Sequence, residues 1–581
     1  MTSDPPAREH YVSRVLDVLA ARPDVVVVRW RDLELTGRRL RDAVLRARDA
    51  LAAAGLPGPA GPPGARPPCV GLLAESNHPA LLAHRYAAHL LGVTVVHLRS
   101  ANPGPDGVLL DPGAQAGILT ENGACVLVVD PAHARHAEAL RARTPDPLEV
   151  IVAGGLDDPA GDQDGDRDGD GVTRAARELP APVPSPLALE RATVVTYTSG
   201  STGRPKGVSQ PLAAWSALVL DDSAQLAAEQ PVMLVVTPLS HAAGPMADAV
   251  LCAGGTLVLH ERFETAAVLD AFDVHAVTRT YLAVPHLYAL LDHPGLAARV
   301  PGALRALVYS GSQASPERLA RAREVFGAAL VQCYGTTEAG RVTVLEPVDH
   351  WEHELLSSAG RPFPGVEVRV CAPGGGTRPL PDGATGEVLV RSPQMMTHYV
   401  GGGPGTRCEV LHDGWLRTGD LGRWDAYGYL HLVDRLDGVI KTAGVKVRPA
   451  EVARALLATG EVGEAVVHRV LDGDGGEHVG AAVTPAGTPA GGLAAAARTD
   501  PRALLGRLAA AVAEGLSPVH APSRIALWSR IPLTDNGKPD LRRIGSPGGD
   551  PDVLAVAGPA GPVSPAGLAA SRTARHTEDT R

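Results

Sequence analysis

The most informative stretch of the chain runs from Thr196 to Val208 and reads TYTSGSTGRPKGV. It follows a β-branched run at residues 192–195 that is typical of a buried strand. Its glycines allow backbone N–H groups to approach phosphate oxygens, its hydroxyls add hydrogen-bond donors, and Lys206 adds a positive charge. The stretch therefore predicts a phosphate-binding loop rather than a flexible Ser/Gly linker. It differs from a Walker A loop, because Lys206 follows a proline and no Gly-Lys-Ser/Thr ends the stretch.

Outward from this loop, the pattern of apolar residues predicts an α/β fold class. Short β-branched runs at residues 25–28, 69–73, 93–98, 125–130 and 148–153 alternate with helical stretches rich in Ala, Leu and Arg. Such alternation favours a largely parallel sheet. From Gly365 onward the runs are shorter and separated by turn residues, which predicts a small β-barrel-like subdomain.

These patterns predict the domain organisation. We expect a large N-terminal domain, residues 1–436, made of α/β subdomains and the β-barrel-like subdomain, and a small mobile α+β domain, residues 437–545. Asp-Gly repeats and Pro-Ala-Pro predict a flexible insertion at residues 156–186, because such a composition cannot bury enough apolar surface to become ordered. The Gly-, Pro- and Ala-rich residues 546–581 predict a disordered tail.

Composition excludes several classes of function. The 581 residues include 54 Lys and Arg against 64 Asp and Glu, a net charge of −10, so no nucleic-acid partner is expected. No apolar run reaches the roughly 18 to 20 residues of a membrane span, and the first residues lack a signal-peptide pattern. We expect a cytoplasmic protein with no membrane partner. The six cysteines form no Cys-x-x-Cys pair, which favours free thiols over a zinc site.

The loop at residues 199–207 resembles the signature of the adenylate-forming superfamily, which contains acyl-CoA and aryl-CoA synthetases, luciferases and the adenylation domains of nonribosomal peptide synthesis. Further similar segments follow in the expected order: YGTTE at 334–338, GRP at 360–362, WLRTGD at 415–420, VDRLD at 433–437 and NGK at 536–538. Together these segments lie within residues 196–541. The first 190 residues share only the general pattern of apolar and polar residues with the superfamily and contain none of its motifs. The resemblance implies an AMP-forming acid–thiol ligase that uses ATP, Mg²⁺ and coenzyme A.

The resemblance implies a nucleotide-binding role for each of these segments. The residues that would surround the phosphates are Thr198, Ser199, Gly200, Ser201, Thr202, Gly203 and Lys206. Those that would contact adenine and the α-phosphate side are Gly311, Ser312, Gln313, Tyr334, Gly335, Thr336 and Thr337. Glu338 would bind the Mg²⁺ that neutralises the leaving pyrophosphate. Asp420 would accept hydrogen bonds from the ribose hydroxyls, and Arg435 would reach the ribose and phosphate region.

The resemblance also implies which residues act in catalysis: Lys538, Thr198, Glu338, Lys441 and His241. Lys538 would bridge the substrate carboxylate and the phosphate oxygen while the acyl-adenylate forms. Rotation at Asp437 would then remove Lys538 and bring the face from Lys441 to Lys446 to the site. Residues 442–444 resemble the small-residue border of a pantetheine tunnel. Lys446 stands where coumarate-CoA ligases have Gln, which is a departure from their pattern on the face proposed for thiol transfer.

The segment from Thr237 to Gly244 indicates the class of acid. Relatives that activate amino acids place an aspartate in this region, because a desolvated α-ammonium without a partner costs several kcal/mol. This segment offers His241 and no acidic residue before Asp248. We therefore expect a carboxylic acid without an α-amine, with His241 at the carboxylate end. A buried core histidine is the alternative.

The sequence predicts a two-step ligase and leaves three alternatives open. The predicted enzyme forms an acyl-adenylate and transfers the acyl group to the thiol of coenzyme A. A carrier-protein phosphopantetheine could replace coenzyme A. The chain could instead activate nitrite to diazotise an aryl amine. A nucleotide-binding protein without catalysis is disfavoured, because a sensor would not need Lys538. The identity of the acid and the oligomeric state are not predicted.

Overall fold

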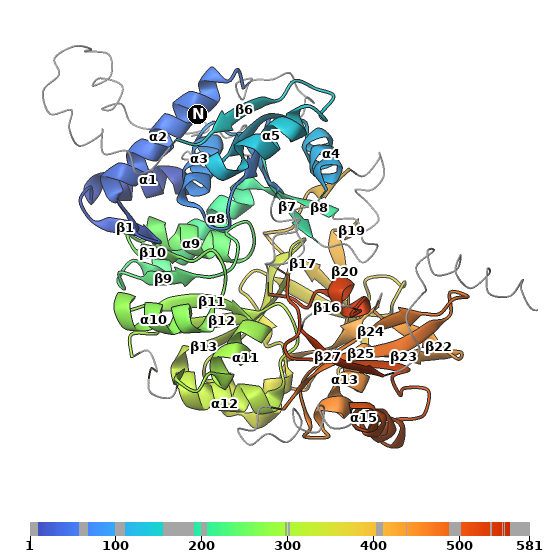
Figure 1. Ribbon diagram of the computed structural model, residues 1–581. Helices are drawn as coiled ribbons and strands as arrows, with labels where there is room; N and C mark the ends of the chain where they lie inside the picture. The colour runs from blue at the N-terminus through green and yellow to red at the C-terminus, as the bar shows by residue number, and fades with distance from the viewer. Residues whose placement is uncertain are drawn as a thin grey trace, which may run out of the picture.

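The computed structural model describes residues 10–56, 68–98, 111–154, 191–198, 206–296, 299, 302–401, 411–436, 438–486, 501–534, 537–548, 550 and 552–557. The expected insertion at 156–186, the loop residues 199–205 and the expected pivot Asp437 lie outside the described residues. Figure 1 shows the N-terminal sheet at the top, a second α/β unit in the middle and the C-terminal unit at the lower right.

The upper unit contains a seven-stranded sheet. In spatial order its strands are β18 (His398–Val400), β8 (Lys206–Pro211), β7 (Thr193–Thr198), β4 (Thr94–His97), β3 (Cys69–Leu73), β5 (Ala124–Val129) and β6 (Glu149–Val152). The strands from β7 to β6 run parallel, while β8 and β18 are antiparallel additions. Its helices are α2 (Gly37–Ala53), α3 (Pro79–Leu90), α4 (Pro112–Asn122), η2 (Pro131–His133) and α5 (Ala134–Arg141). All five residues of the central strand β3 are buried, as is typical of a parallel sheet covered by helices.

The middle unit contains a nine-stranded sheet. In order its strands are β15 (Arg361–Pro362), β14 (Gly340–Leu345), β13 (Leu330–Thr336), β12 (Ala306–Ser310), β11 (Arg279–Ala283), β9 (Val232–Val235), β10 (Thr256–Leu259), β1 (Val26–Trp30) and β2 (Leu33–Thr36). The six strands from β13 to β1 are parallel. Its helices are α1 (Tyr11–Ala21), α8 (Leu212–Leu226), α9 (Ala243–Cys252), α10 (Thr265–His275), α11 (Val284–Asp292), α12 (Pro316–Phe326) and η5 (Gly327–Ala329). The prediction of an α/β fold with largely parallel sheets is confirmed.

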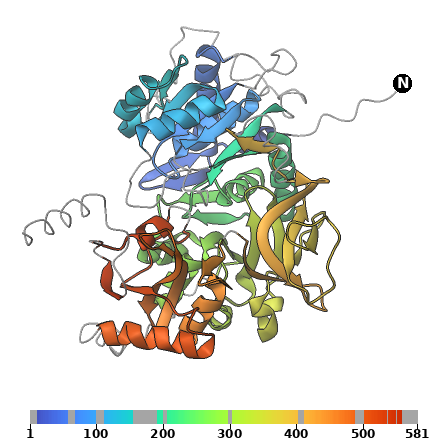
Figure 2. The same cartoon turned by 90° about the vertical axis from the view of Figure 1, so that its right-hand side faces the viewer.

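A five-stranded antiparallel sheet follows in the chain, as the shorter runs after Gly365 predict. Its strands are β16 (Glu367–Cys371), β17 (Gly386–Arg391), β20 (Trp415–Trp424) and β19 (Leu411–His412), with β21 (Leu430–Arg435) on the other part of β20. The connection from the middle unit contains η6 (Asp349–Trp351) and η7 (His353–Ser357). Figure 2 shows this sheet to the right of the middle unit and the C-terminal unit to its lower left.

The C-terminal unit is an α+β structure. Its strands are β22 (Ile440–Thr442), β23 (Val445–Val447), β24 (Val462–Leu471), β25 (Glu477–Pro485), β26 (Arg524–Trp528) and β27 (Val553–Ala557), and its helices are α13 (Pro449–Leu457), α15 (Pro501–Gly515) and α16 (Leu541–Gly545). Apolar side chains of α13 and α15 pack against the four-stranded sheet β24-β25-β26-β27. Across the described parts of the chain, no helix has the length and apolar character needed to cross a membrane.

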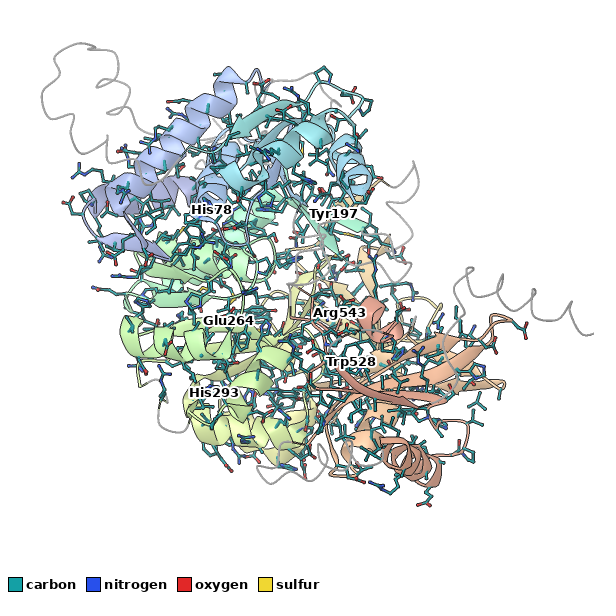
Figure 3. All side chains as sticks on the ribbon, viewed as in Figure 1. His78, Tyr197, Glu264, His293, Trp528 and Arg543 are labelled. Carbon is teal, nitrogen blue, oxygen red and sulfur yellow. The ribbon has the colours of Figure 1, made fainter. Side chains whose placement is uncertain are left out.

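The expectation of a disordered tail from residue 546 is wrong for its first part. Strand β27 pairs with β26 in antiparallel register, and Arg543 binds Asp550 at 3.0 Å on the way to it. Figure 3 labels Arg543 and the fully buried Trp528 in this unit. Because residues 546–581 are rich in Gly and Pro, their composition did not indicate the short apolar run that forms β27. This run becomes a strand through backbone hydrogen bonds with β26. Residues 558–581 lie outside the described residues.

Candidate active site

The strands β7 and β8 hold the two ends of the predicted phosphate loop. Thr198, the last residue of β7, is the cross-strand partner of Lys206, the first residue of β8. Seven residues, 199–205, connect them, so Ser199, Gly200, Ser201, Thr202 and Gly203 lie outside the described residues. The Lys206 ammonium lies 5.6 Å from the centre of the Tyr399 ring, in the range of a cation–π contact.

Three residues from separate predicted motifs form one hydrogen-bonded group. The Tyr334 hydroxyl donates to one carboxylate oxygen of Asp420 at 2.6 Å, and the Arg435 guanidinium donates to the other at 3.0 Å. Pairing of β20 with β21 sets Asp420 directly opposite Arg435. Burial raises the pKa of the Tyr334 hydroxyl, and the Asp420 charge raises it further, so the tyrosine stays protonated as a donor.

Glu338 lies at the turn between β13 and β14, next to the end of β8. The Tyr399 hydroxyl donates to its Oε1 at 2.8 Å, and the backbone N–H of Met396 donates to its carbonyl at 2.7 Å. The side-chain amide of Gln210 donates to the carbonyl of Thr337 at 3.0 Å, which ties β8 to this turn. Thr336 caps the same turn through a hydrogen bond from Ala339.

A Mg²⁺ ion fits this carboxylate. No three His, Cys, Asp or Glu side chains gather into a metal site in the described ranges. Mg²⁺ is commonly bound by one or two carboxylates together with substrate phosphates, and a single oriented glutamate meets that need. The hydrogen bond from Tyr399 fixes one oxygen of Glu338, which sets the direction of the other.

Lys538 reaches this group from the C-terminal unit. Its charge interacts with Arg435, Glu338 and Asp420, although these residues belong to distant parts of the chain. Burial among protein atoms and the Arg435 charge lower the pKa of Lys538, while the two carboxylates oppose the shift. The side chain nevertheless keeps an exposed surface. A Cβ built on Gly311 would lie 3.8 Å from its Cε, so Lys538 also borders the expected adenine segment.

The turn that carries Lys538 packs tightly against the middle unit. Gly537 has a φ of +72°, and a Cβ there would lie 2.5 Å from the Cβ of Ala283 and 2.6 Å from Cε1 of His286. Backbone hydrogen bonds between Thr534 and Lys538 close the turn. The His286 ring in turn stacks on Phe263 with centres 4.3 Å apart, and burial lowers its pKa to about 4, so it is neutral at pH 7.

The predicted adenine segment follows β12. Gly311 has a φ of +98°, which glycine adopts without strain, and Gly311, Ser312 and Gln313 are all exposed. They follow the carboxyl end of a parallel strand, and Tyr334 and Gly335 lie near the carboxyl end of the adjacent strand β13. Ligands of open parallel sheets bind outside these strand ends. The segments therefore have the geometry of a ligand-binding edge.

The segment with His241 is anchored by side chains from other elements. Asn77 bonds the carbonyl of Thr237 at 3.1 Å and the N–H of Leu239 at 2.9 Å. The Arg85 guanidinium donates to the carbonyl of Leu239 at 3.2 Å, and the Thr196 hydroxyl donates to the carbonyl of Ser240 at 3.1 Å. His241 itself is half-buried. These hydrogen bonds hold the His241 segment beside the strand that enters the phosphate loop.

Asp248 cannot pair with an α-ammonium in this arrangement. It is fully buried and forms an ion pair with Arg85, and it also accepts hydrogen bonds from Tyr86 at 2.7 Å and Trp215 at 2.9 Å. Burial raises its pKa, and the Arg85 charge opposes this shift. Asp248 therefore gives no support to an amino-acid substrate, and an acid without an α-amine stays a prediction.

Lys441 is not brought to the group around Lys538. It lies in the hairpin β22–β23, where Ala443 and Gly444 turn the chain with φ of 48° and 78°. Its backbone N–H donates to Glu477 at 2.7 Å, and Figure 1 shows β22 at the outer edge of the C-terminal unit. The sequence alone did not point to Tyr399, Asn77 or Arg85, because none of them stands in a motif and each acts through a contact made across the chain.

The two largely parallel sheets, the antiparallel sheet, the α+β C-terminal unit and the ordered motifs place the protein among the adenylate-forming enzymes. The chain belongs to the AMP-binding enzyme family, whose model matches residues 16–400. A medium/long-chain-fatty-acid–CoA ligase of Mycobacterium tuberculosis is 33% identical over 524 residues, 88% of this chain and 86% of that protein. A feruloyl-CoA synthase of an Amycolatopsis species is 34% identical over 521 residues, 89% of this chain and 94% of that protein.

A solved structure is similar over nearly the whole chain. The amide bond synthetase McbA from Marinactinospora thermotolerans superimposes with a TM-score of 0.73 at 34% identity, covering 93% of this chain and 99% of that one.

Proposed function

We propose that the protein activates a carboxylic acid without an α-amine as an acyl-adenylate and transfers the acyl group to the thiol of coenzyme A. In the first step, a carboxylate oxygen attacks the α-phosphorus of ATP, and pyrophosphate leaves. In the second, the thiol sulfur attacks the acyl carbonyl, loses its proton, and AMP leaves. The full-length similarity to two acyl-CoA-forming ligases supports this reaction.

The observation that carries the proposal is the position of Lys538. The charges of Glu338, Asp420 and Arg435, the residues proposed to contact the metal, ribose and phosphates, act on its ammonium and shift its pKa. An ammonium in this position would stabilise the negative charge that develops at the attacking carboxylate and the α-phosphate. Asp420, which Tyr334 and Arg435 hold by hydrogen bonds, would accept hydrogen bonds from the ribose hydroxyls. Mg²⁺ at Glu338 would supply charge neutralisation for the leaving pyrophosphate.

The thiol-transfer step is proposed to use a second arrangement of the C-terminal unit. In the described arrangement the charges of Glu338, Asp420 and Arg435 act on Lys538, while β22, the strand of Lys441, lies at the outer edge of the C-terminal unit (Figure 1). A rotation at Asp437, between the proposed domains 1–436 and 437–545, would exchange the two faces. Residues 442–444 would then border the path of the pantetheine arm.

A second candidate function differs only in the nucleophile. The similarity to an amide bond synthetase at 34% identity supports an amine as the alternative nucleophile. Its nitrogen would attack the acyl carbonyl and release AMP. A carrier-protein phosphopantetheine is the corresponding thiol alternative to coenzyme A. Incubating the enzyme with ATP, an activated acid and each nucleophile in turn, followed by mass spectrometry of the product, separates a thioester from an amide.

The test of adenylation is acid-dependent ATP–pyrophosphate exchange across a panel of aryl and alkyl acids. Lys538→Ala should lower kcat for exchange by about 100-fold or more, because it removes a charge directed at the transition state. Arg530→Ala is a matched control: Arg530 is 76% exposed and lies eight residues before Lys538. Exchange that is equally fast in Lys538→Ala and the parent would contradict the proposed role. Absence of exchange with every acid would contradict the function.

A further inference from the structure

We propose that Asp222 and Arg341 bind a hydroxyl group of the substrate acid. This hydroxyl would lie at the end of the acid remote from its reacting carboxylate. This inference rests on the proposed function and adds the chemistry of its substrate. A hydroxyl suits the pair because it can donate a hydrogen bond to the carboxylate of Asp222 and accept one from the guanidinium of Arg341.

Arg341 stands directly beside the proposed nucleotide site. It is three residues beyond Glu338, at the start of β14, and its cross-strand partner in β13 is Gly335 of the YGTTE motif. Its backbone N–H is held by the side chain of Gln394 at 3.0 Å, and its guanidinium lies 4.8 Å from the centre of the Phe363 ring. Gln394 therefore positions the backbone of Arg341, and the Phe363 ring positions its guanidinium, both without Asp222.

Asp222 faces it from helix α8. This helix begins immediately after β8, the strand that starts with Lys206 and whose Gln210 bonds Thr337. Asp222 lies ten residues beyond Leu212, about 15 Å along the helix at 1.5 Å per residue. An acid whose carboxylate meets the α-phosphate near Thr337 and extends along α8 would present its far end to Asp222.

The contacts of the pair leave hydrogen-bonding capacity for a ligand. One guanidinium nitrogen of Arg341, Nη1, bonds both oxygens of Asp222 at 3.0 and 3.1 Å. The Nε atom of Arg341 is buried and has no partner among the residues that the structure describes. A purely structural ion pair commonly forms two parallel N–H···O bonds from different nitrogens of the arginine. The Asp222 carboxylate oxygens keep further lone pairs, which can accept a hydrogen bond from a ligand hydroxyl.

The burial of the ion pair is intermediate. The side chain of Asp222 is 19% exposed and that of Arg341 36%, so the pair is neither in the core nor fully solvated. Burial raises the pKa of Asp222, and the Arg341 charge and hydrogen bond oppose this shift. Near Asp222 along the chain, Leu220 of α8 packs against a core cluster that includes Val219, and Met246 of α9 and Tyr281 of β11 pack against the same cluster.

The test compares matched acids that differ only in a hydroxyl. The probes are benzoic acid against 2-, 3- and 4-hydroxybenzoic acid, cinnamic against 4-hydroxycinnamic acid, and octanoic against 8-hydroxyoctanoic acid, each in ATP–pyrophosphate exchange. A site built to bond a hydroxyl rejects the analogue that lacks it, because its own polar groups are then left unpaired. We expect the parent to favour at least one hydroxy acid over its matched analogue by 10-fold or more in kcat/KM.

The variants separate recognition from folding. Asp222→Leu combined with Arg341→Met removes both charges, so neither is left buried and unpaired. It should bring the hydroxy-to-plain ratio of kcat/KM close to one. Asp221→Asn is the matched control, since Asp221 is the exposed neighbour on α8, and it should keep the parent ratio.

The outcomes distinguish this inference from the function on which it rests. Two outcomes overturn hydroxyl recognition by Asp222 and Arg341 while the ligase function stands. One is a parent enzyme that prefers plain acids, and the other is a double variant with the same hydroxy-to-plain ratio of kcat/KM as the parent. A parent that exchanges pyrophosphate with no acid overturns both. If the double variant is inactive toward every acid, the single variant Asp222→Asn is measured instead. An unchanged hydroxy-to-plain ratio of kcat/KM in that variant, with thermal unfolding like that of the parent, also overturns the inference.

Discussion

At the scale of single residues, the hydrogen bond from Tyr334 to Asp420 predicts an effect on ATP binding. Tyr334→Phe keeps the ring but removes the 2.6 Å hydrogen bond to the carboxylate. Hydrogen bonds to charged groups contribute about 1.5–3 kcal/mol, so KM for ATP should rise about 10-fold or more while KM for the acid stays nearly constant. Tyr427→Phe, at a tyrosine that is 75% exposed, provides the control. Equal changes in both KM values would argue for a general loss of structure.

Lys538 predicts how adenylation depends on pH. Burial and Arg435 lower its pKa below the usual 10.5, and the ammonium is the form that stabilises the transition state. As pH rises through the lowered pKa, the charge and the activity are lost together, so exchange should decline on the alkaline side below pH 10.5. Lys538→Arg should move this decline to higher pH, because arginine stays protonated. A profile identical to that of the parent would assign the decline to another group.

At the scale of elements, the turn around Gly537 predicts a test of the described arrangement. A methyl group at Gly537 would collide with Ala283 and His286, and its φ of +72° disfavours any other residue. Gly537→Ala should therefore lower kcat for pyrophosphate exchange at least 10-fold while thermal unfolding changes little. Gly545→Ala in α16 is the control, because a Cβ there meets no atom within 4 Å. Equal activity of the two variants would mean that the close packing of this turn is not needed for adenylation.

Elements also show what could be predicted from the sequence. Strands β3 and β5 match the expected runs at 69–73 and 125–130 to within one residue, because each is a compact apolar run in a parallel pairing. Strand β27 could not be predicted in the same way, since its short run of apolar residues lies among glycine and proline and is stabilised by β26. The order of motifs anticipated the group of Tyr334, Asp420 and Arg435. It did not anticipate Tyr399, whose hydrogen bond to Glu338 depends on the fold.

At the scale of the whole molecule, the position of the C-terminal unit predicts that the two half-reactions can be separated. Lys441 lies apart from Lys538, on a hairpin bound to Glu477. Lys441→Ala should leave pyrophosphate exchange within about twofold of the parent, because the adenylation arrangement does not use it. Formation of acyl-CoA from acid, ATP and coenzyme A should fall about 10-fold or more, because the proposed rotated arrangement brings Lys441 to the site. Loss of both activities would contradict two separate arrangements.

The anchoring of the His241 segment has a practical consequence for altering this protein. Its backbone is tied by side chains of Asn77, Arg85 and Thr196, which come from the seven-stranded sheet and its helices rather than from the segment itself. A segment transplanted from a relative would arrive without the partners that shape it. Successful chimeras should therefore exchange the upper unit and this segment together, because the hydrogen-bond partners of the segment lie in that unit.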